Sequence, residues 1–113
     1  MRVGFIMLNR NDTEILNRIK GILAPTGMIE SIILFGSRAY GQNFNEQSDY
    51  DILLISSELY DWQKQDYIFD LLYDVQLEYD IVIDIHFLAK SEFESIRAKQ
   101  PIFQKALTEG IFV

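Results

Sequence analysis

Two aspartates one residue apart, Asp49 and Asp51, stand at the start of an apolar run in this sequence. Residues two apart in a strand project on the same face, so we expect the two carboxylates to lie side by side. Like charges at such a distance repel unless a cation lies between them, and Mg²⁺ favours sites of one or two carboxylates completed by waters and substrate phosphates. The two aspartates alone leave two interpretations open, a metal site and a solvated turn at Ser48-Asp49, and the turn is the more common of the two.

A third aspartate, Asp84, lies within an alternating apolar pattern that spans residues 79–88. An ionised side chain in an apolar strand is costly unless it is paired or binds a metal. We therefore expect Asp84 to join the first two carboxylates if the strands are neighbours, with Asp80 on the same face as the alternative. His86 shares this face, and a lone histidine beside a site is more often a hydrogen-bonded structural group than a base.

A turn of small residues, Gly36-Ser37-Arg38, precedes Asp49. Gly36 permits a tight turn that a Cβ atom would block, and a helix starting after it would direct backbone N–H groups at an anion. Ser37 leaves room for a phosphate and offers it a hydroxyl donor. Arg38 can contact a phosphate or pair with an acidic neighbour. The alternative is a strand-to-helix turn that holds no ligand.

Helices are the first elements that must position these residues, and hydrophobic periodicity predicts two long ones. Residues 12–23 have one apolar face, with Asn11 or Asp12 as the expected N-cap, and Pro25 and Gly27 follow as stop signals. A second helix is expected over residues 59–79, with an apolar face that begins near its first tryptophan. The apolar residues of that second pattern are Leu59, Trp62, Tyr67, Phe69, Leu71, Leu72, Val75 and Leu77.

Strands are expected where apolar runs are bounded by turn residues, over residues 29–35, 50–56 and 79–88. After them, Ser91–Glu94 has the spacing of a capping box and predicts another helix. Pro101 should begin a short last helix that Gly110 ends, and the final residues could add an edge strand. This order predicts an α/β (α+β) fold in one domain over residues 1–113, with a small mixed β-sheet and helices packed on it.

Composition and charge narrow the class of protein. The chain has 113 residues, no cysteine and a formal net charge of −7, with a sequence pI of about 4.5. The absence of cysteine excludes disulfides and thiolate metal sites and suits the cytoplasm. No apolar run is long enough to cross a bilayer. The acidic balance argues against direct nucleic-acid binding and leaves room for a basic protein partner.

The motifs together are more specific than any one of them. "FGSRAYG", eleven residues between Ser37 and Asp49, "SDYDILLI" and then Asp84 in a later strand form one pattern. The pattern resembles the minimal nucleotidyltransferases of the DNA polymerase β superfamily, over nearly the whole chain from about Ile15 to Val113. One departure is Tyr40, which stands before Gly41 where many relatives carry arginine.

The resemblance implies a nucleotidyltransferase fold and a division of roles. Gly36 and Ser37, with Arg38 beside them, would hold the phosphates of a nucleoside triphosphate. Asp49 and Asp51 would bind Mg²⁺, two ions in the family's mechanism. Asp84 would help to hold one ion and activate the acceptor hydroxyl, after which the nucleoside monophosphate is transferred and pyrophosphate leaves. These carboxylates and glycine-turn residues are therefore the expected catalytic, metal and nucleotide-binding residues.

A stand-alone domain of this size resembles the antitoxin of HEPN–MNT toxin–antitoxin pairs. The resemblance implies transfer of AMP from ATP to a tyrosine of a HEPN ribonuclease partner. Two alternatives stay open: an antitoxin that acts by binding alone, and a small-molecule nucleotidyltransferase that works as a homodimer. The sequence itself records neither the nucleotide preference nor the acceptor hydroxyl.

Overall fold

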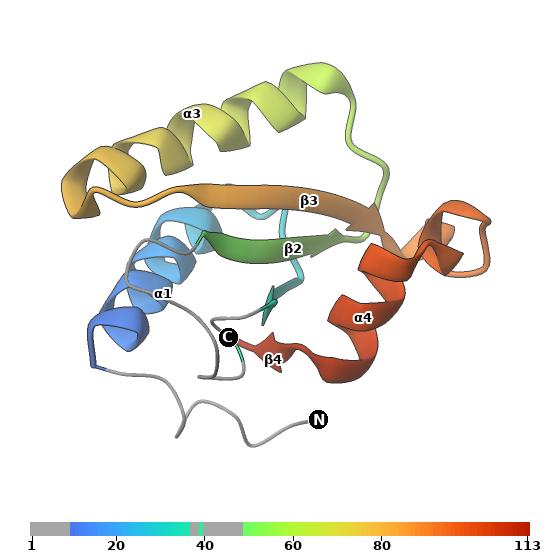
Figure 1. Cartoon of the computed structure of the whole chain (residues 1–113). Coiled ribbons are helices and arrows are strands. Elements are labelled where there is room, and N and C mark those ends of the chain that lie inside the picture. The colour runs from blue at the N-terminus through green and yellow to red at the C-terminus, as the bar shows by residue number, and fades with distance from the viewer. Residues whose placement is uncertain (1–9, 37–38, 40–48) are drawn as a thin grey trace.

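A computed structural model describes residues 10–36, 39 and 49–113. Four strands in these residues form one sheet, and helices pack on both of its faces (Figure 1). The elements in chain order are α1 (Arg10–Leu23), η2 (Ala24–Thr26), β1 (Ser31–Phe35), β2 (Tyr50–Ser56), α3 (Trp62–Tyr79), β3 (Ile83–Ala89), η3 (Lys90–Glu92), η4 (Arg97–Lys99), α4 (Pro101–Glu109) and β4 (Ile111–Phe112).

The sheet is mixed and has the strand order β3-β2-β1-β4. β1 is antiparallel to both β2 and β4, whereas β2 and β3 are parallel. Parallel neighbours need a long crossover connection, and α3 supplies it. The expected α/β fold with a small mixed sheet is therefore confirmed, and no helix in the described ranges is both long and apolar enough to cross a membrane.

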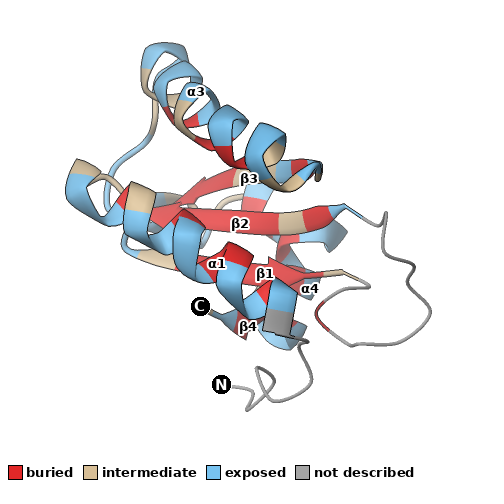
Figure 2. Ribbon diagram, turned by 90° about the vertical axis from the view of Figure 1, so that its left-hand side faces the viewer, coloured by how far each residue is buried: buried red, intermediate tan, exposed pale blue. Residues whose placement is uncertain are grey.

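Each face of the sheet has its own core, as alternation along the strands requires. α1 and α3 cover one face, where the largest cluster of buried residues includes Ile15, Leu34, Ile52 and Leu72. α4 and η4 cover part of the other face through Phe103, Ala106 and Ala98. Figure 2 shows the buried residues concentrated in the strands and on the inward sides of the helices.

The N-cap predicted for the first helix is wrong. α1 already includes Asn11 and Asp12, so neither residue caps it. Asp12 instead lies on the inward side, 1% exposed, where its carboxylate accepts a hydrogen bond from the hydroxyl of Tyr50. The expected stop is confirmed, because η2 follows the helix and Gly27 closes it in the left-handed region with φ +69°.

The third strand begins four residues later than the alternation of residues 79–88 predicted. α3 extends to Tyr79, and Asp80 ends it in the left-handed conformation with φ 54°. The N–H group of Ile81 then donates to the Gln76 carbonyl at 3.1 Å, and that of Ile83 donates to the Gln76 side chain at 3.0 Å. The first residues of the alternating run therefore form the end of α3 and its cap, and side-chain alternation does not reveal such a cap.

The long helix is confirmed as α3, but it begins at Trp62, later than predicted, and its predicted apolar face is wrong in part. The residues of α3 that are buried are Ile68, Leu72 and Val75. Trp62 and Leu77, which the apolar pattern includes, are exposed. Apolar residues thus occupy two sides of α3, and only one of them faces the sheet.

The helix predicted from Ser91 is replaced by two short 3-10 turns, η3 and η4. The Glu92 side chain accepts the N–H of Ala89 at 3.0 Å, as a capping glutamate does, but it also binds Arg97 at 2.8 Å. Arg97 in turn donates to the Phe87 carbonyl at 2.8 Å, which ties these turns to β3. The predicted start of the last helix at Pro101 and the edge strand β4 are both confirmed.

Candidate active site

The parallel pairing of β2 and β3 places Asp51 directly opposite Asp84. Directly paired residues project on the same face, and here it is the face that α4 covers farther along the strands. One ligand atom from each of Asp51, Asp84 and His86 lies within 4.8 Å of the others. Strand register thus brings together side chains that are more than thirty residues apart in the sequence.

The electrostatics of this pair favour a bound positive charge. Partial burial raises the pKa of Asp51, and the Asp84 carboxylate beside it raises this pKa further. The charge of Asp49 acts in the same direction, whereas His86 lowers the pKa of Asp51. Asp51 therefore holds a proton more readily than a free aspartate does, and a cation between the two carboxylates would relieve their repulsion.

His86 is held in place on two sides. Its Nε2 atom lies 3.2 Å from Oδ2 of Asp84, and its ring packs against Phe35 with centroids 5.6 Å apart. The prediction that His86 makes a hydrogen bond is confirmed. The imidazole is 21% exposed and the Asp84 side chain is 52% exposed. The more buried histidine therefore helps to orient the more exposed carboxylate.

Gly36 closes the site at the end of β1, next to the strand that carries Asp51. Its φ is +79°, and a Cβ atom at this position would lie 2.3 Å from Oδ2 of Asp51. Both the backbone conformation and the close approach therefore require glycine. The N–H of Ala39 donates to the Gly36 carbonyl at 3.1 Å. Ser37 and Arg38 lie outside the described residues, so their contacts with phosphate stay predictions.

The two remaining aspartates of the sequence pattern lie in different places. Asp49 is exposed and lies one residue before β2, where strand alternation no longer fixes the direction of its side chain. It is not one of the three side chains within 4.8 Å, although its charge acts on Asp51. Asp80 caps α3, three residues before β3 begins. Of the two alternatives for the third carboxylate, the fold brings Asp84 to Asp51.

Tyr50 and Asp12 form a buried contact next to the site that the sequence did not predict. Tyr50 stands between the two aspartates of the motif but is buried on the opposite face, where its hydroxyl meets Asp12 of α1. A signal for this contact exists in the sequence. Asp12 lies three and seven residues before Ile15 and Ile19, so it shares the apolar face of its helix.

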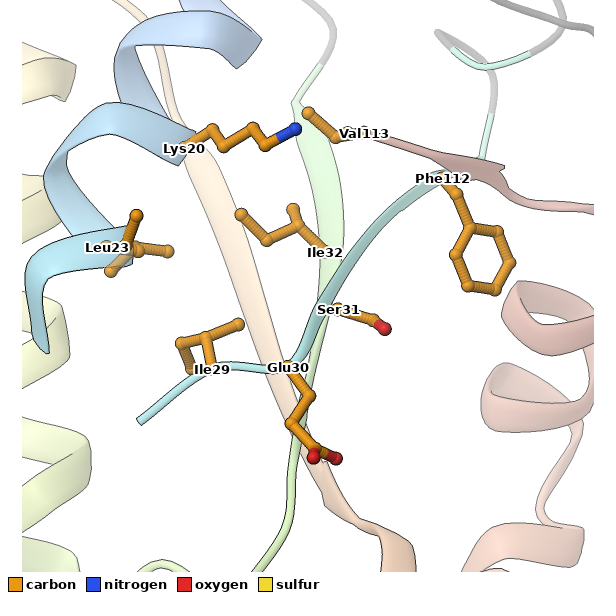
Figure 3. A pocket seen from close by; sticks show the side chains of 9 residues that line it. Lys20, Leu23, Ile29, Glu30, Ser31, Ile32, Phe112 and Val113 are labelled. Carbon is orange, nitrogen blue, oxygen red and sulfur yellow. The ribbon is translucent and has the colours of Figure 1, made fainter. Parts of the chain in front are cut away.

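A pocket of about 210 Å³ lies away from these carboxylates (Figure 3). It is lined by the end of α1, the start of β1 and the last residues of the chain, including Lys20, Ile32 and Val113. Ser31 at this end of β1 pairs with Ile55, whereas Phe35 at the other end pairs with Asp51. The pocket is therefore at the opposite end of the strands from the carboxylate pair.

The chemistry of the donor set fits a divalent cation. The group offers two carboxylates, which are the ligands of Mg²⁺, and an imidazole nitrogen, which suits other divalent metals. After burial, the charge of Asp84 is the next cause of the raised pKa of Asp51, and a cation would offset that charge. Gly36 has no side chain that would block the space beside Asp51. Two carboxylates at the start of two parallel strands, beside a glycine turn, are a donor set of the kind that metal-dependent enzymes of phosphate chemistry use.

Comparison with known proteins supports this class. Residues 17–110 match the family described as "Polymerase beta, Nucleotidyltransferase", and the chain belongs to this family. The fold is similar to that of a chain in a crystal structure of a mutant of the toxin–antitoxin MntA–HpeT. The TM-score is 0.57 at 20% sequence identity, and the match covers 94% of this chain and 72% of that chain. No curated protein matches the sequence significantly.

Proposed function

We propose that this protein is a Mg²⁺-dependent nucleotidyltransferase that transfers AMP from ATP to a hydroxyl group of a protein partner. The contact between Asp51 and Asp84 across β2 and β3 is the observation that carries this proposal. Family membership supports nucleotidyl transfer in general, and the metal, the nucleotide and the acceptor are our inference.

In the proposed reaction, the acceptor oxygen forms a bond to the α-phosphorus, and the bond between that phosphorus and the bridging oxygen to the β-phosphate breaks. Pyrophosphate leaves with the electron pair of the broken bond, and the acceptor proton passes to a carboxylate oxygen of Asp84. Asp51 and Asp84, with Asp49 beside them, would hold the metal, and His86 would orient Asp84 through its hydrogen bond. Bound Mg²⁺ would neutralise charge on the phosphates and stabilise the attacking and leaving oxygens.

The partner we propose is a HEPN ribonuclease toxin, with this chain as its cytoplasmic antitoxin. The similar solved structure is that of a toxin–antitoxin, which supports a partner of this kind. The net charge of −7 suits a basic partner, because complementary charges steer association.

Incubation of the purified chain with labelled ATP, Mg²⁺ and the product of the neighbouring gene tests the proposal. We expect label on the partner with the wild type and with Asp80→Asn, which keeps the helix cap. We expect none with Asp51→Asn or Asp84→Asn, because each removes one member of the carboxylate pair. The opposite outcome has two parts: the wild type does not label the partner, and the double variant Asp49→Ala, Asp51→Ala still neutralises it. That outcome would establish an antitoxin that acts by binding alone.

A further inference from the structure

α3 carries a line of exposed apolar side chains that the core does not use. The line, which we call the aromatic stripe, consists of Trp62, Phe69, Tyr73 and Leu77, which are 70%, 42%, 58% and 63% exposed. Spacings of seven, four and four residues place them along one side of the helix. The buried side of α3 belongs to other residues, so most of the stripe is left uncovered, and the ring of Phe69 also contacts Phe87 of β3.

A row of carboxylates runs beside the stripe. Asp66, Asp70, Asp74 and Glu78 recur every four residues along α3, and all four are exposed. Glu78 pairs with Arg18 at 3.3 Å, and none of the ion pairs found within residues 10–36 and 49–113 involves the other three. Lys64 is the only basic residue of the helix.

The stripe lies over the free edge of the sheet and leads toward the carboxylate pair. Phe69 packs edge-on against Phe87 of β3, with ring centroids 5.6 Å apart, and β3 is an edge strand. α3 runs back from the end of β2 to the start of β3, where Asp84 is the second residue (Figure 1). The end of the stripe at Leu77 therefore lies at the end of the sheet that carries the site.

The charge of this surface selects among possible occupants. An exposed apolar line with three aromatic rings is typical of a protein interface. A second copy would bring another helix with four carboxylates and a single lysine against the first, and the like charges would repel. A helix with an apolar seam and flanking lysines or arginines would cover the stripe and neutralise the acidic row at once.

We propose that the outer side of α3 docks a basic amphipathic helix of the protein that this enzyme modifies. The inference rests on the proposed function only in naming that protein as the acceptor. Docking along α3 would bring the acceptor to the end of the sheet that carries Asp51 and Asp84, whose side chains project on the face opposite α3. It would give the enzyme specificity that the small site cannot supply by itself.

Trp62 is the only tryptophan of the chain, so its fluorescence reports occupation of this surface. The probe is a synthetic helical peptide of 18 residues, the length of α3, with a leucine seam flanked by lysines and no tryptophan. We expect it to shift the Trp62 emission saturably, without metal or nucleotide, and to bind more weakly as salt is raised. The same peptide with glutamates in place of lysines should cause no shift.

Variants of exposed residues test the location. We expect Asp70→Lys and Tyr73→Ala each to weaken binding of the basic peptide by about tenfold or more. Matched controls are Glu94→Lys, the same change of charge outside α3, and Ile96→Ala, an apolar residue 85% exposed outside α3. Both controls should bind the peptide as the wild type does.

The absence of a shift up to about 100 µM peptide would overturn the proposal. Equal binding of the acidic peptide, or equal losses in the matched controls, would overturn it too. Self-association that Tyr73→Ala abolishes would also overturn it and assign the stripe to a second copy. Because no nucleotide is present, loss of peptide binding says nothing against nucleotidyl transfer, and an inactive enzyme can still bind the peptide.

Discussion

Gly36 and Gly27 have similar backbone conformations but different surroundings. Their φ values are +79° and +69°, yet a Cβ atom at Gly36 would meet the Asp51 carboxylate whereas one at Gly27 would meet nothing within 4 Å. We expect Gly27→Ala and Gly36→Ala each to cost about 1–2 kcal/mol of stability through the left-handed backbone. Only Gly36→Ala should also displace Asp51 and abolish binding of Mg²⁺ with nucleotide.

Urea denaturation and titration calorimetry of both alanine variants separate these effects. Gly27→Ala is the matched control, since it carries the same backbone strain without the clash. If Gly36→Ala binds Mg²⁺ and nucleotide as Gly27→Ala does, the approach of Gly36 to Asp51 has no role in the site.

The raised pKa of Asp51 makes the stability of the metal-free protein depend on pH. Because this pKa lies above the usual 3.8, the folded protein retains a proton that the unfolded chain releases between 3.8 and the folded pKa. The free energy of unfolding therefore falls as pH rises through that window. We expect Asp51→Asn to raise the Tm at about pH 7 and the gain to vanish below about pH 4, where the carboxyl is protonated in both states.

Thermal denaturation followed by circular dichroism across this pH range measures the difference between variant and wild type. Asp80→Asn is the control, because asparagine tolerates the left-handed conformation of the helix cap and Asp80 is exposed. A Tm of Asp51→Asn at neutral pH that equals or falls below the wild-type Tm would show that the carboxylate pair is not repulsive.

At the scale of elements, the bond between Tyr50 and Asp12 joins α1 to the start of β2. Both residues are buried, so removal of the donor leaves a carboxylate with one hydrogen bond fewer in the core. We expect Tyr50→Phe to lower the free energy of unfolding by about 1–3 kcal/mol. Affinity for Mg²⁺ with nucleotide should weaken as well, because Asp51 is the next residue of the strand.

Urea denaturation of Tyr50→Phe measures the stability, with Tyr73→Phe as the control because Tyr73 is 58% exposed. Equal midpoints for the two variants would mean that the bond contributes no net stability. Unchanged nucleotide affinity in a destabilised Tyr50→Phe would mean that it supports the fold and not the site.

The elements that the sequence predicted well are those with one strong signal. β2 has the bounds of the apolar run 50–56, and α4 begins and ends at the proline and glycine expected to bound it. The predicted boundaries of elements are wrong where a local contact competes with the sequence pattern. Asp80 ends α3 inside a run that alternates like a strand, and Glu92 binds Arg97 where a capping box suggested a helix.

The sequence predicted the pairing of Asp51 with Asp84 only on the condition that their strands are neighbours. Register is a property of the whole sheet, and the sequence of either strand alone does not contain it. The buried side of α3 was misjudged for a related reason. Its apolar residues occupy two sides of the helix, and only contact with the sheet decides which side is core.

At the scale of the whole molecule, the proposed reaction would need the metal for two purposes, because the chain is acidic and a nucleoside triphosphate is an anion. The net charge of −7 repels phosphates at a distance, and the Asp51–Asp84 pair repels itself at close range. One bound cation reduces both costs, so metal and nucleotide should bind more tightly together than separately. Cooperative binding of this kind is measurable as thermal stabilisation.

We expect Mg²⁺ with ATP to raise the Tm of the wild type by about 10 °C at ligand concentrations near one hundred times Kd. Mg²⁺ or ATP alone should raise it much less. Asp51→Asn should show no such rise, although without ligands it is expected to be the more stable protein at neutral pH. The order of stability of the two proteins should therefore reverse when both ligands are added. Since simple damage to the fold would lower both values, only a metal site held by a strained carboxylate pair predicts this reversal, and a wild type indifferent to both ligands together would contradict it.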